Sequence, residues 1–168
     1  MPKIIEDLPR RLMEEARRQV QESGYSALTI RSVAKGCGVG IGTVYNYYAS
    51  RDALVASFLL KDWNRCLDEI HAAGEAAILP EPVLRKVYDS LNQFLQQHAA
   101  VFRDEAAASG FAGSFSHYHG LLRDQLAEPI RRFCPDDFTA EFIAEAMLVW
   151  TVAGKTFDEL YAPIQKLL

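Results

Sequence analysis

The chain has 168 residues, 49% of them hydrophobic and 24% charged, which excludes a disordered chain and is ordinary for a folded globular protein. The net charge of −4 is unevenly distributed. Residues 1–51 contain 8 Lys/Arg and 5 Asp/Glu, whereas residues 52–168 contain 10 Lys/Arg and 17 Asp/Glu. A mildly basic N-terminal segment before an acidic remainder suits a protein that approaches phosphate groups with one end only.

The cysteine spacing and the hydropathy argue against a zinc-binding, disulfide-rich, secreted or membrane-spanning protein. Cys37, Cys66 and Cys134 form no CxxC pair, so neither a zinc site nor a disulfide framework is indicated. The N-terminus lacks the uninterrupted apolar core of a signal peptide, and no stretch reaches the roughly 18 apolar residues that span a bilayer. We therefore expect a cytoplasmic protein.

Helical periodicity dominates the sequence, and strand-like alternation is nearly absent. In the N-terminal third, the apolar spacing predicts three helices, the first ended by Gly24. Thr29 is placed to cap the second helix, because its hydroxyl can accept hydrogen bonds from first-turn amides. These helices are expected at residues 7–22, 30–36 and 41–47.

The remainder of the chain predicts further helices, with breaks at Pro80 and Pro135. Ser50 should cap the long helix that follows it, and Pro129 should kink or end the helix that contains it. The expected ranges are 51–73, 82–97, a short helix within 98–114, 115–133, 137–153 and 156–168. The predicted fold is therefore all-α, with an N-terminal three-helix helix-turn-helix head (residues 1–50) and a C-terminal helical body (residues 51–168).

The sharpest signal is the segment TIRSVAKGCGVGIGTVYNYYASRDAL, residues 29–54. It places small and apolar residues where two short helices would cross around a small core. Ala34 is small at the expected crossing, and Gly38 lies in the turn, where a positive φ costs glycine little. The side chains expected to face inward are Val33, Cys37, Val39, Val44 and Tyr47.

Residues 8–54 resemble the DNA-binding region of the TetR/AcrR family of bacterial regulators. Gly24-Tyr25 with Thr29-Ile30-Arg31-Ser32-Val33-Ala34 is similar to the family signature GY…T…IA. GVGIGTVYNYY, residues 38–48, resembles GVSxGTxYxYF, and residues 50–54 resemble SKxxL. The resemblance covers about a third of the chain. It implies a transcription regulator, commonly a repressor, that binds a pseudo-palindromic DNA operator as a homodimer and is released by a small-molecule effector.

The resemblance also implies residue roles by position. The residues implied to contact phosphates are Thr43, Tyr45, Tyr48 and Arg51. Thr29 and Arg31 begin the supporting helix, which would cross the DNA backbone. Gly42 and Asn46 would face base edges, where Asn suits a bidentate bond with adenine.

Two positions of the expected DNA-binding face depart from the family pattern. Gly40 stands where the family often has Ser or Thr, and Ile41 where it often has a polar residue. Ile41 could touch a thymine methyl or cover the local core.

The body carries many aromatic residues beside irregular, glycine-bearing segments, an arrangement common around apolar ligand pockets. For each aromatic residue, plain core packing is the alternative. The acidic body favours a neutral or cationic apolar effector over an anion. The candidate ligand-binding residues are Phe94, His98, Phe102, Phe111, Phe115, Tyr118, His119 and Trp150.

The last two predicted helices have more apolar surface than packing against the core of one chain would bury. The first is apolar over more than half of its circumference, and the second has an i, i+3, i+4, i+7 stripe. We expect both to form a four-helix interface with a second copy. The candidate interface residues are Phe142, Met147, Leu160, Ile164 and Leu167.

No residue arrangement typical of catalysis occurs, so no catalytic residue and no cofactor are expected. His117 and His119 lie two apart on a predicted helix and point to different faces, which disfavours a metal site. Cys37 is expected to fill the core. The alternative function is a helical small-molecule-binding protein or enzyme that has lost DNA binding, which Gly40 and Ile41 alone favour.

Overall fold

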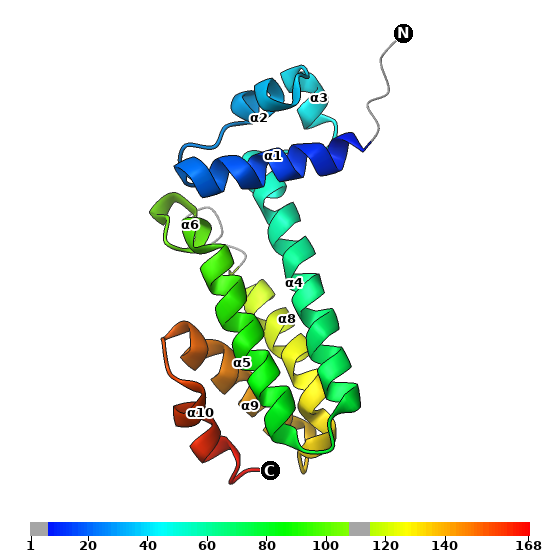
Figure 1. The fold of residues 1–168 in the computed structure, drawn as a ribbon, viewed down its shortest axis with the longest axis vertical. Coiled ribbons are helices and arrows are strands. Elements are labelled where there is room, and N and C mark those ends of the chain that lie inside the picture. The colour runs from blue at the N-terminus through cyan, green and yellow to red at the C-terminus, as the bar shows by residue number, and fades with distance from the viewer. Residues whose placement is uncertain (1–6, 108–114) are drawn as a thin grey trace. The chain divides into compact units, whose positions relative to one another are not determined.

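The computed structural model describes residues 7–107 and 115–168, and for residues 115–117 the backbone alone. All regular structure in these ranges is helical, which confirms the predicted all-α class (Figure 1). The elements are α1 (Leu8–Ser23), α2 (Ile30–Cys37), α3 (Ile41–Tyr45), α4 (Arg51–Ala76), α5 (Pro80–Gln97), α6 (Ala99–Phe102), α8 (Phe115–Ala127), the 3-10 helix η2 (Glu128–Phe133), α9 (Asp137–Val152) and α10 (Phe157–Ile164).

The described residues fall into two compact units. The first contains the chain up to Asp62 together with the segment that begins at His98. The second contains Trp63–Gln97 and the helices from α8 onward. Because α4 continues through Asp62 into Trp63, one helix contributes to both units. A functional boundary at residue 50 remains a prediction.

The first unit is built on the apolar face of α1. Its buried residues recur every four positions, at Leu8, Leu12, Ala16 and Val20, as expected for one face of a helix. In Figure 1, α2 and α3 lie together on one side of α1. The core that they share is completed by Tyr25, Leu28, Val33, Ala34, Val44, Leu54, Val55, Phe58 and Val101.

One inward-facing assignment in this unit is wrong. Tyr47 is 50% exposed, whereas the neighbouring Tyr48 is partly buried, packs against the core and donates a hydrogen bond to the Pro9 carbonyl (3.0 Å). The reason is that α3 ends at Tyr45, two residues earlier than predicted, so helical spacing no longer applies at positions 47 and 48. The other four assignments are confirmed, with Val39 only partly buried.

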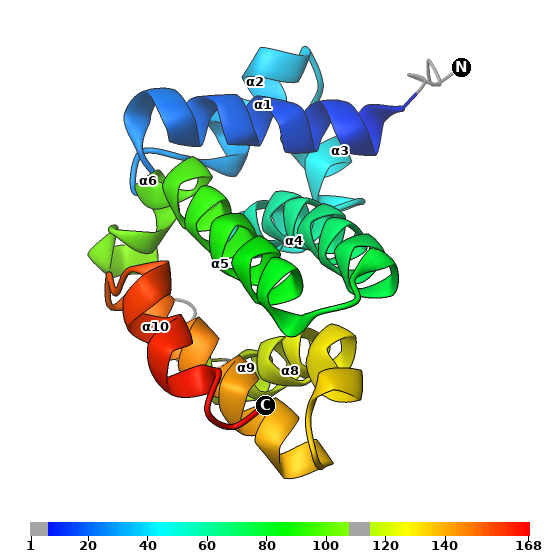
Figure 2. The same ribbon diagram turned by 60° about the horizontal axis from the view of Figure 1, so that its bottom comes forward.

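The second unit packs the later part of α4 with α5, α8, η2, α9 and α10. In Figure 2, α8 and α9 lie side by side, and α10 lies beside α9. Pro129 ends the α-helix early, as predicted, because α8 stops at Ala127 and the chain continues as η2. The core includes Ile70, Val83, Leu84, Val87, Leu126, Ile130, Ile143, Met147, Phe157, Leu160 and Ile164.

The C-terminal helix is shorter than predicted. A capping box starts α10, since Thr156 Oγ1 accepts from the Glu159 amide while Glu159 accepts from the Thr156 amide. The helix ends at Ile164, one residue after Pro163. Among the described residues, no helix has the length and apolarity needed to cross a membrane.

Candidate nucleic-acid interface

The α2–turn–α3 segment has the local geometry of a helix-turn-helix. Thr29 caps α2 through a reciprocal pair of bonds with Ser32, which satisfies amides at the helix start. Gly38 ends α2 with a φ of +70°, a left-handed conformation that glycine adopts without strain. The chain therefore turns sharply and starts α3 at Ile41.

Only one residue of α3 is fully buried. Val44 has no exposed surface, whereas Ile41, Gly42 and Tyr45 are exposed and Thr43 is intermediate. Asn46, directly after the helix, is exposed as well. The face predicted to meet DNA bases is thus directed to solvent, and Val44 holds the helix to the head.

The phosphate-contacting candidates lie in different environments. Arg31 and Tyr45 are exposed, and Thr29 is exposed although its hydroxyl serves as the α2 cap. Tyr48 is the partly buried residue bonded to Pro9. Contacts of these residues with DNA remain predictions.

Arg51 takes part in a polar contact within the head. Its guanidinium lies over the Tyr25 ring (4.3 Å to the centroid) and donates to the Tyr25 hydroxyl (3.2 Å). Tyr25 in turn donates to Asp52, and burial together with that carboxylate raises the pKa of the Tyr25 phenol. The start of α4 is thereby joined to the loop that follows α1. Arg51 therefore has a structural role that its sequence position did not indicate.

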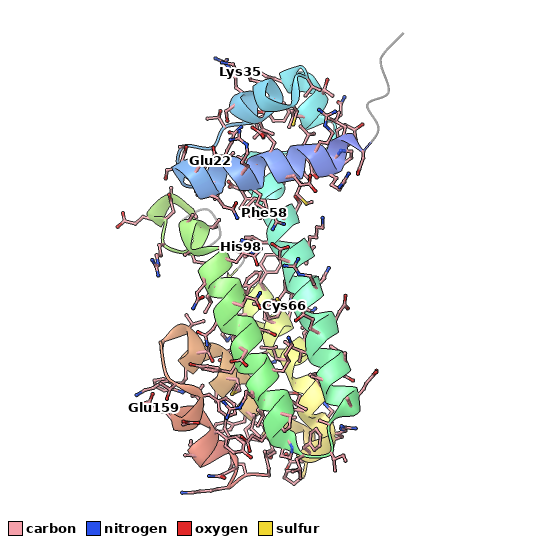
Figure 3. The ribbon with its side chains drawn as sticks, viewed as in Figure 1. Glu22, Lys35, Phe58, Cys66, His98 and Glu159 are labelled. Carbon is pink, nitrogen blue, oxygen red and sulfur yellow. The ribbon has the colours of Figure 1, made fainter. Side chains whose placement is uncertain are left out.

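A buried ionic cluster in the first unit escaped sequence reasoning. Asp62 accepts two bonds from the Arg17 guanidinium (2.5 and 3.2 Å), and its carboxylate lies 3.0 Å from His98 Nε2. The Asp62 and His98 side chains are 3% and 2% exposed, and the His98 ring stacks on Phe58 (Figure 3). These residues are 36 or more positions apart, so no local spacing could have revealed the cluster.

All three residues of this cluster belong to the first unit. Asp62 is the last residue of α4 assigned to the first unit, and His98 is the residue at which the chain returns to it. Arg17 belongs to α1. The ion pairs therefore link α1 to the two positions at which the chain leaves the first unit and returns to it.

The residues predicted to line a ligand pocket are not gathered into one cluster within either unit. Phe94 packs edge-on against Trp63 in the second unit, whereas His98 and Phe102 belong to the first. Tyr118 and Trp150 are about half exposed, and His119 pairs with Glu145 (2.8 Å). Phe111 and the Phe115 side chain lie outside the described residues. A ligand role for these residues stays a prediction.

The predicted dimer interface requires correction at three residues. Met147, Leu160 and Ile164 are 1%, 6% and 3% exposed and form part of the core of the second unit. Their side chains are therefore not available to a partner. Phe142 and Leu167 are exposed, at 53% and 42%.

A different apolar face is exposed on α8 and α9, which lie against each other. We call it the α8/α9 face. On α9 positions 138, 142, 145, 149 and 152 recur at intervals of three or four, with the Glu145–His119 ion pair in the middle, and Trp150 lies beside this row. Its exposed apolar members are Tyr118, Leu121, Phe138, Phe142, Val149, Trp150 and Val152.

Clusters of metal-ligating side chains and the Cys37 thiol are two further candidate sites. No group of three or more His, Cys, Asp or Glu side chains able to hold a metal occurs within the described ranges. Cys37 is buried, and this burial raises the pKa of its thiol. That environment fits the expected role of Cys37 as a core filler.

Comparison with known proteins identifies the N-terminal segment. Residues 12–58 match the sequence profile of the family described as "Bacterial regulatory proteins, tetR family". The match covers α2, the turn and α3, together with most of α1 and the beginning of α4.

Curated relatives extend the similarity beyond this segment. The transcriptional regulator UidR of Escherichia coli K12 is 23% identical over 126 residues, 72% of this chain and 63% of UidR. The chain thus spans less than two thirds of the length of UidR. The transcriptional regulator BetI of Rhizobium meliloti is 29% identical over 170 residues, covering 96% of this chain and 80% of BetI. Both relatives are described as transcriptional regulators.

A solved structure shares the fold. The transcriptional regulator FadR of Bacillus subtilis, determined in complex with stearoyl-CoA, superposes with a TM-score of 0.54 and covers 94% of both chains. Its sequence identity to this chain is 16%, so the comparison supports the helical architecture alone.

Proposed function

We propose that this chain is a transcription regulator of the TetR family and that it acts as a repressor, binding a DNA operator through α2 and α3. The match of residues 12–58 to the family model and the similarity to curated transcriptional regulators support this proposal. The observation that carries this proposal is the exposed face of α3 on a capped helix-turn-helix whose only fully buried α3 residue is Val44. In such a motif the second helix enters the major groove and the first crosses the backbone. A regulator of this kind acts in the cytoplasm, where the chromosome is.

The proposal includes a homodimer formed through the α8/α9 face. Seven large apolar side chains exposed on two adjacent helices exceed what a monomer usually leaves in one patch. Helical spacing along α9 suits knobs-into-holes packing against the same helices of a second copy. A two-fold dimer would place two α3 helices in successive major grooves, roughly 34–36 Å apart, on a pseudo-palindromic operator.

The proposal also includes release from DNA by a small molecule bound in the helical body. The family resemblance supports this regulation, and the FadR structure provides a helical neighbour that holds an acyl-CoA. An effector weakens DNA binding only by the difference in its affinity for the two states of the protein.

DNA binding is tested with the duplex upstream of the gene for this chain and a scrambled duplex of equal length. We expect specific binding that weakens as salt rises, because phosphate contacts release counterions. Arg31 is exposed at the start of α2, and Arg31→Ala should flatten the log–log salt slope by about one unit. Lys166→Ala, at the opposite end of the chain, removes the same charge and should leave the slope unchanged.

The alternative, a helical ligand-binding protein without DNA activity, gives the opposite result. It predicts no retention on duplex DNA at low salt and identical behaviour of the two charge variants. That result would refute the regulator function.

The dimer is tested by sedimentation of the full chain. Phe142→Glu places a charge in the α8/α9 face without touching the core, since Phe142 is 53% exposed. We expect a dimer for the wild type and a monomer with weakened operator binding for this variant. Ile78→Glu, at a residue 92% exposed outside the face, is the control and should remain dimeric. A Phe142→Glu protein that stays dimeric would contradict the assignment of this face.

A further inference from the structure

We propose that α3 reads A·T base pairs at the centre of each operator half-site, through Asn46 and Ile41, and that Gly42 provides the clearance which lets both side chains reach the bases. This inference rests on the proposed function and concerns which bases the helix recognises.

The lack of cationic residues in the chain segment that contains α3 is the first argument. No Lys or Arg occurs in residues 36–50. The nearest ones along the chain are Lys35, near the end of α2 and directed away from α1 in Figure 3, and Arg51, which stacks on Tyr25. Guanine is most often recognised by a bidentate Arg or Lys in the major groove. The helix itself therefore lacks the usual means of selecting G·C pairs.

Asn46 is the side chain on this face that can form a bidentate base contact. It is exposed, and its side-chain amide makes no hydrogen bond to the described part of the chain. An Asn amide pairs its oxygen and nitrogen with N6 and N7 of adenine. The geometry of an unengaged, solvent-directed amide therefore favours adenine.

Ile41 supplies an apolar contact. The sequence left two roles open for Ile41, a thymine contact or cover for the core. At 39% exposure it lies outside the core cluster that contains Val44, so covering the core is not its role. The thymine methyl group is the apolar feature of the major groove that such a side chain can contact.

Neither backbone conformation nor packing within the described part of the protein requires a glycine at position 42. Its φ is not in the left-handed region, and a Cβ built there would meet nothing within 4 Å. Glycine also weakens a helix relative to alanine, and α3 has only five residues. Gly42 and Asn46 are four residues apart and so share one side of the helix. A missing side chain at this point lets the backbone approach the base edges, which accounts for a residue that the fold does not require.

The experiment begins with selection of duplexes by the full-length protein from a random pool, followed by titration of the selected operator. Single thymines are then replaced by deoxyuridine, which removes the methyl group, and single adenines by 7-deazaadenine, which removes the N7 acceptor. Guanines are replaced by 7-deazaguanine in parallel.

For the wild type, we expect one deoxyuridine position per half-site to weaken binding about fourfold, the value of one buried methyl group. One 7-deazaadenine position should weaken it about fivefold or more. The first effect should disappear in Ile41→Ala and persist in Ile41→Val, and the second should disappear in Asn46→Ala. Gly42→Ala should keep or raise the melting temperature while losing at least tenfold in operator affinity.

The outcomes separate this inference from the proposed function. If no duplex is selected and low-salt binding is absent, the regulator function itself fails. If a specific operator is selected but its binding depends on guanine N7 and not on thymine methyls or adenine N7, the function stands and the A·T readout is wrong. Unchanged operator affinity of a folded Gly42→Ala protein would overturn the clearance role of Gly42.

Discussion

Removing the carboxylate of Asp62 should destabilise the first unit more than any change at a surface ion pair. Asp62 is 2% exposed and holds both Arg17 and His98, so Asp62→Ala leaves two polar side chains without their anionic partner. Breaking a buried pair from one side costs about 3–5 kcal/mol. Because the Arg17 side chain is 21% exposed and can regain some water, the lower end of about 3 kcal/mol applies.

A loss of this size is readily measured by calorimetry. At about 2–4 °C per kcal/mol for a chain of this length, the melting temperature should fall by about 6–12 °C. Asp62→Asn keeps the shape and removes the charge, and should lose less than Asp62→Ala. The control is Glu81→Ala, which breaks the exposed pair with Arg85 (3.3 Å) and should cost at most about 1 kcal/mol.

A double-mutant cycle with Arg17→Ala gives the coupling directly. We expect the double variant to be less destabilised than the sum of the two single variants, because the charges are removed together. Asp62→Ala with a melting temperature equal to that of Glu81→Ala would refute the reasoning.

Three further predictions concern single residues elsewhere in the chain. Hydrogen bonds from Lys155 and Thr156 lower the pKa of Glu159 to about 2, so its stabilising effect is complete above about pH 4.5 and is lost as the pH falls through 2. The difference in melting temperature between wild type and Glu159→Gln should therefore shrink over that interval, and a constant difference would contradict the prediction. Burial raises the pKa of the Cys37 thiol, so iodoacetamide at pH 7.4 should label Cys37 far more slowly in the native than in the unfolded chain, as read by peptide mass spectrometry. Equal rates would refute this. Gly38→Ala forces a left-handed alanine and should lower the melting temperature by about 2–8 °C, whereas an unchanged value would show that the turn can rearrange.

Local patterns were sufficient to predict the helix-turn-helix. The Thr29 cap, the positive φ of Gly38 and the buried Val44 each depend on a few neighbouring residues, and all three are confirmed. The burial of Tyr48 in place of Tyr47 shows the limit of predictions from helical spacing. Helical spacing predicts burial only while the helix continues, and nothing in the local sequence indicated that α3 would end at Tyr45.

The body was predicted less well because its contacts are not local. The sequence of α9 is apolar on two sides, and periodicity does not say which side meets the core. Burial assigns Met147 to the core and leaves Phe142 exposed. The sequence predicts His98 as a polar group of a ligand pocket, and it does not indicate the pairing with Asp62 across 36 positions of sequence. Such pairing depends on how the units fold and not on spacing along one helix.

The weak attachment of α3 has a consequence for how this protein can change over generations. Of its five residues, only Val44 is fully buried, while most of the others are exposed to solvent. Substitutions at exposed sites usually change the free energy of unfolding by less than about 0.5 kcal/mol. If α3 reads DNA as proposed, mutations at Ile41, Tyr45 or Asn46 would alter the recognised DNA sequence with little loss of folded protein. A duplicated copy of such a gene could acquire a new operator through one or two substitutions while its helical body remained intact.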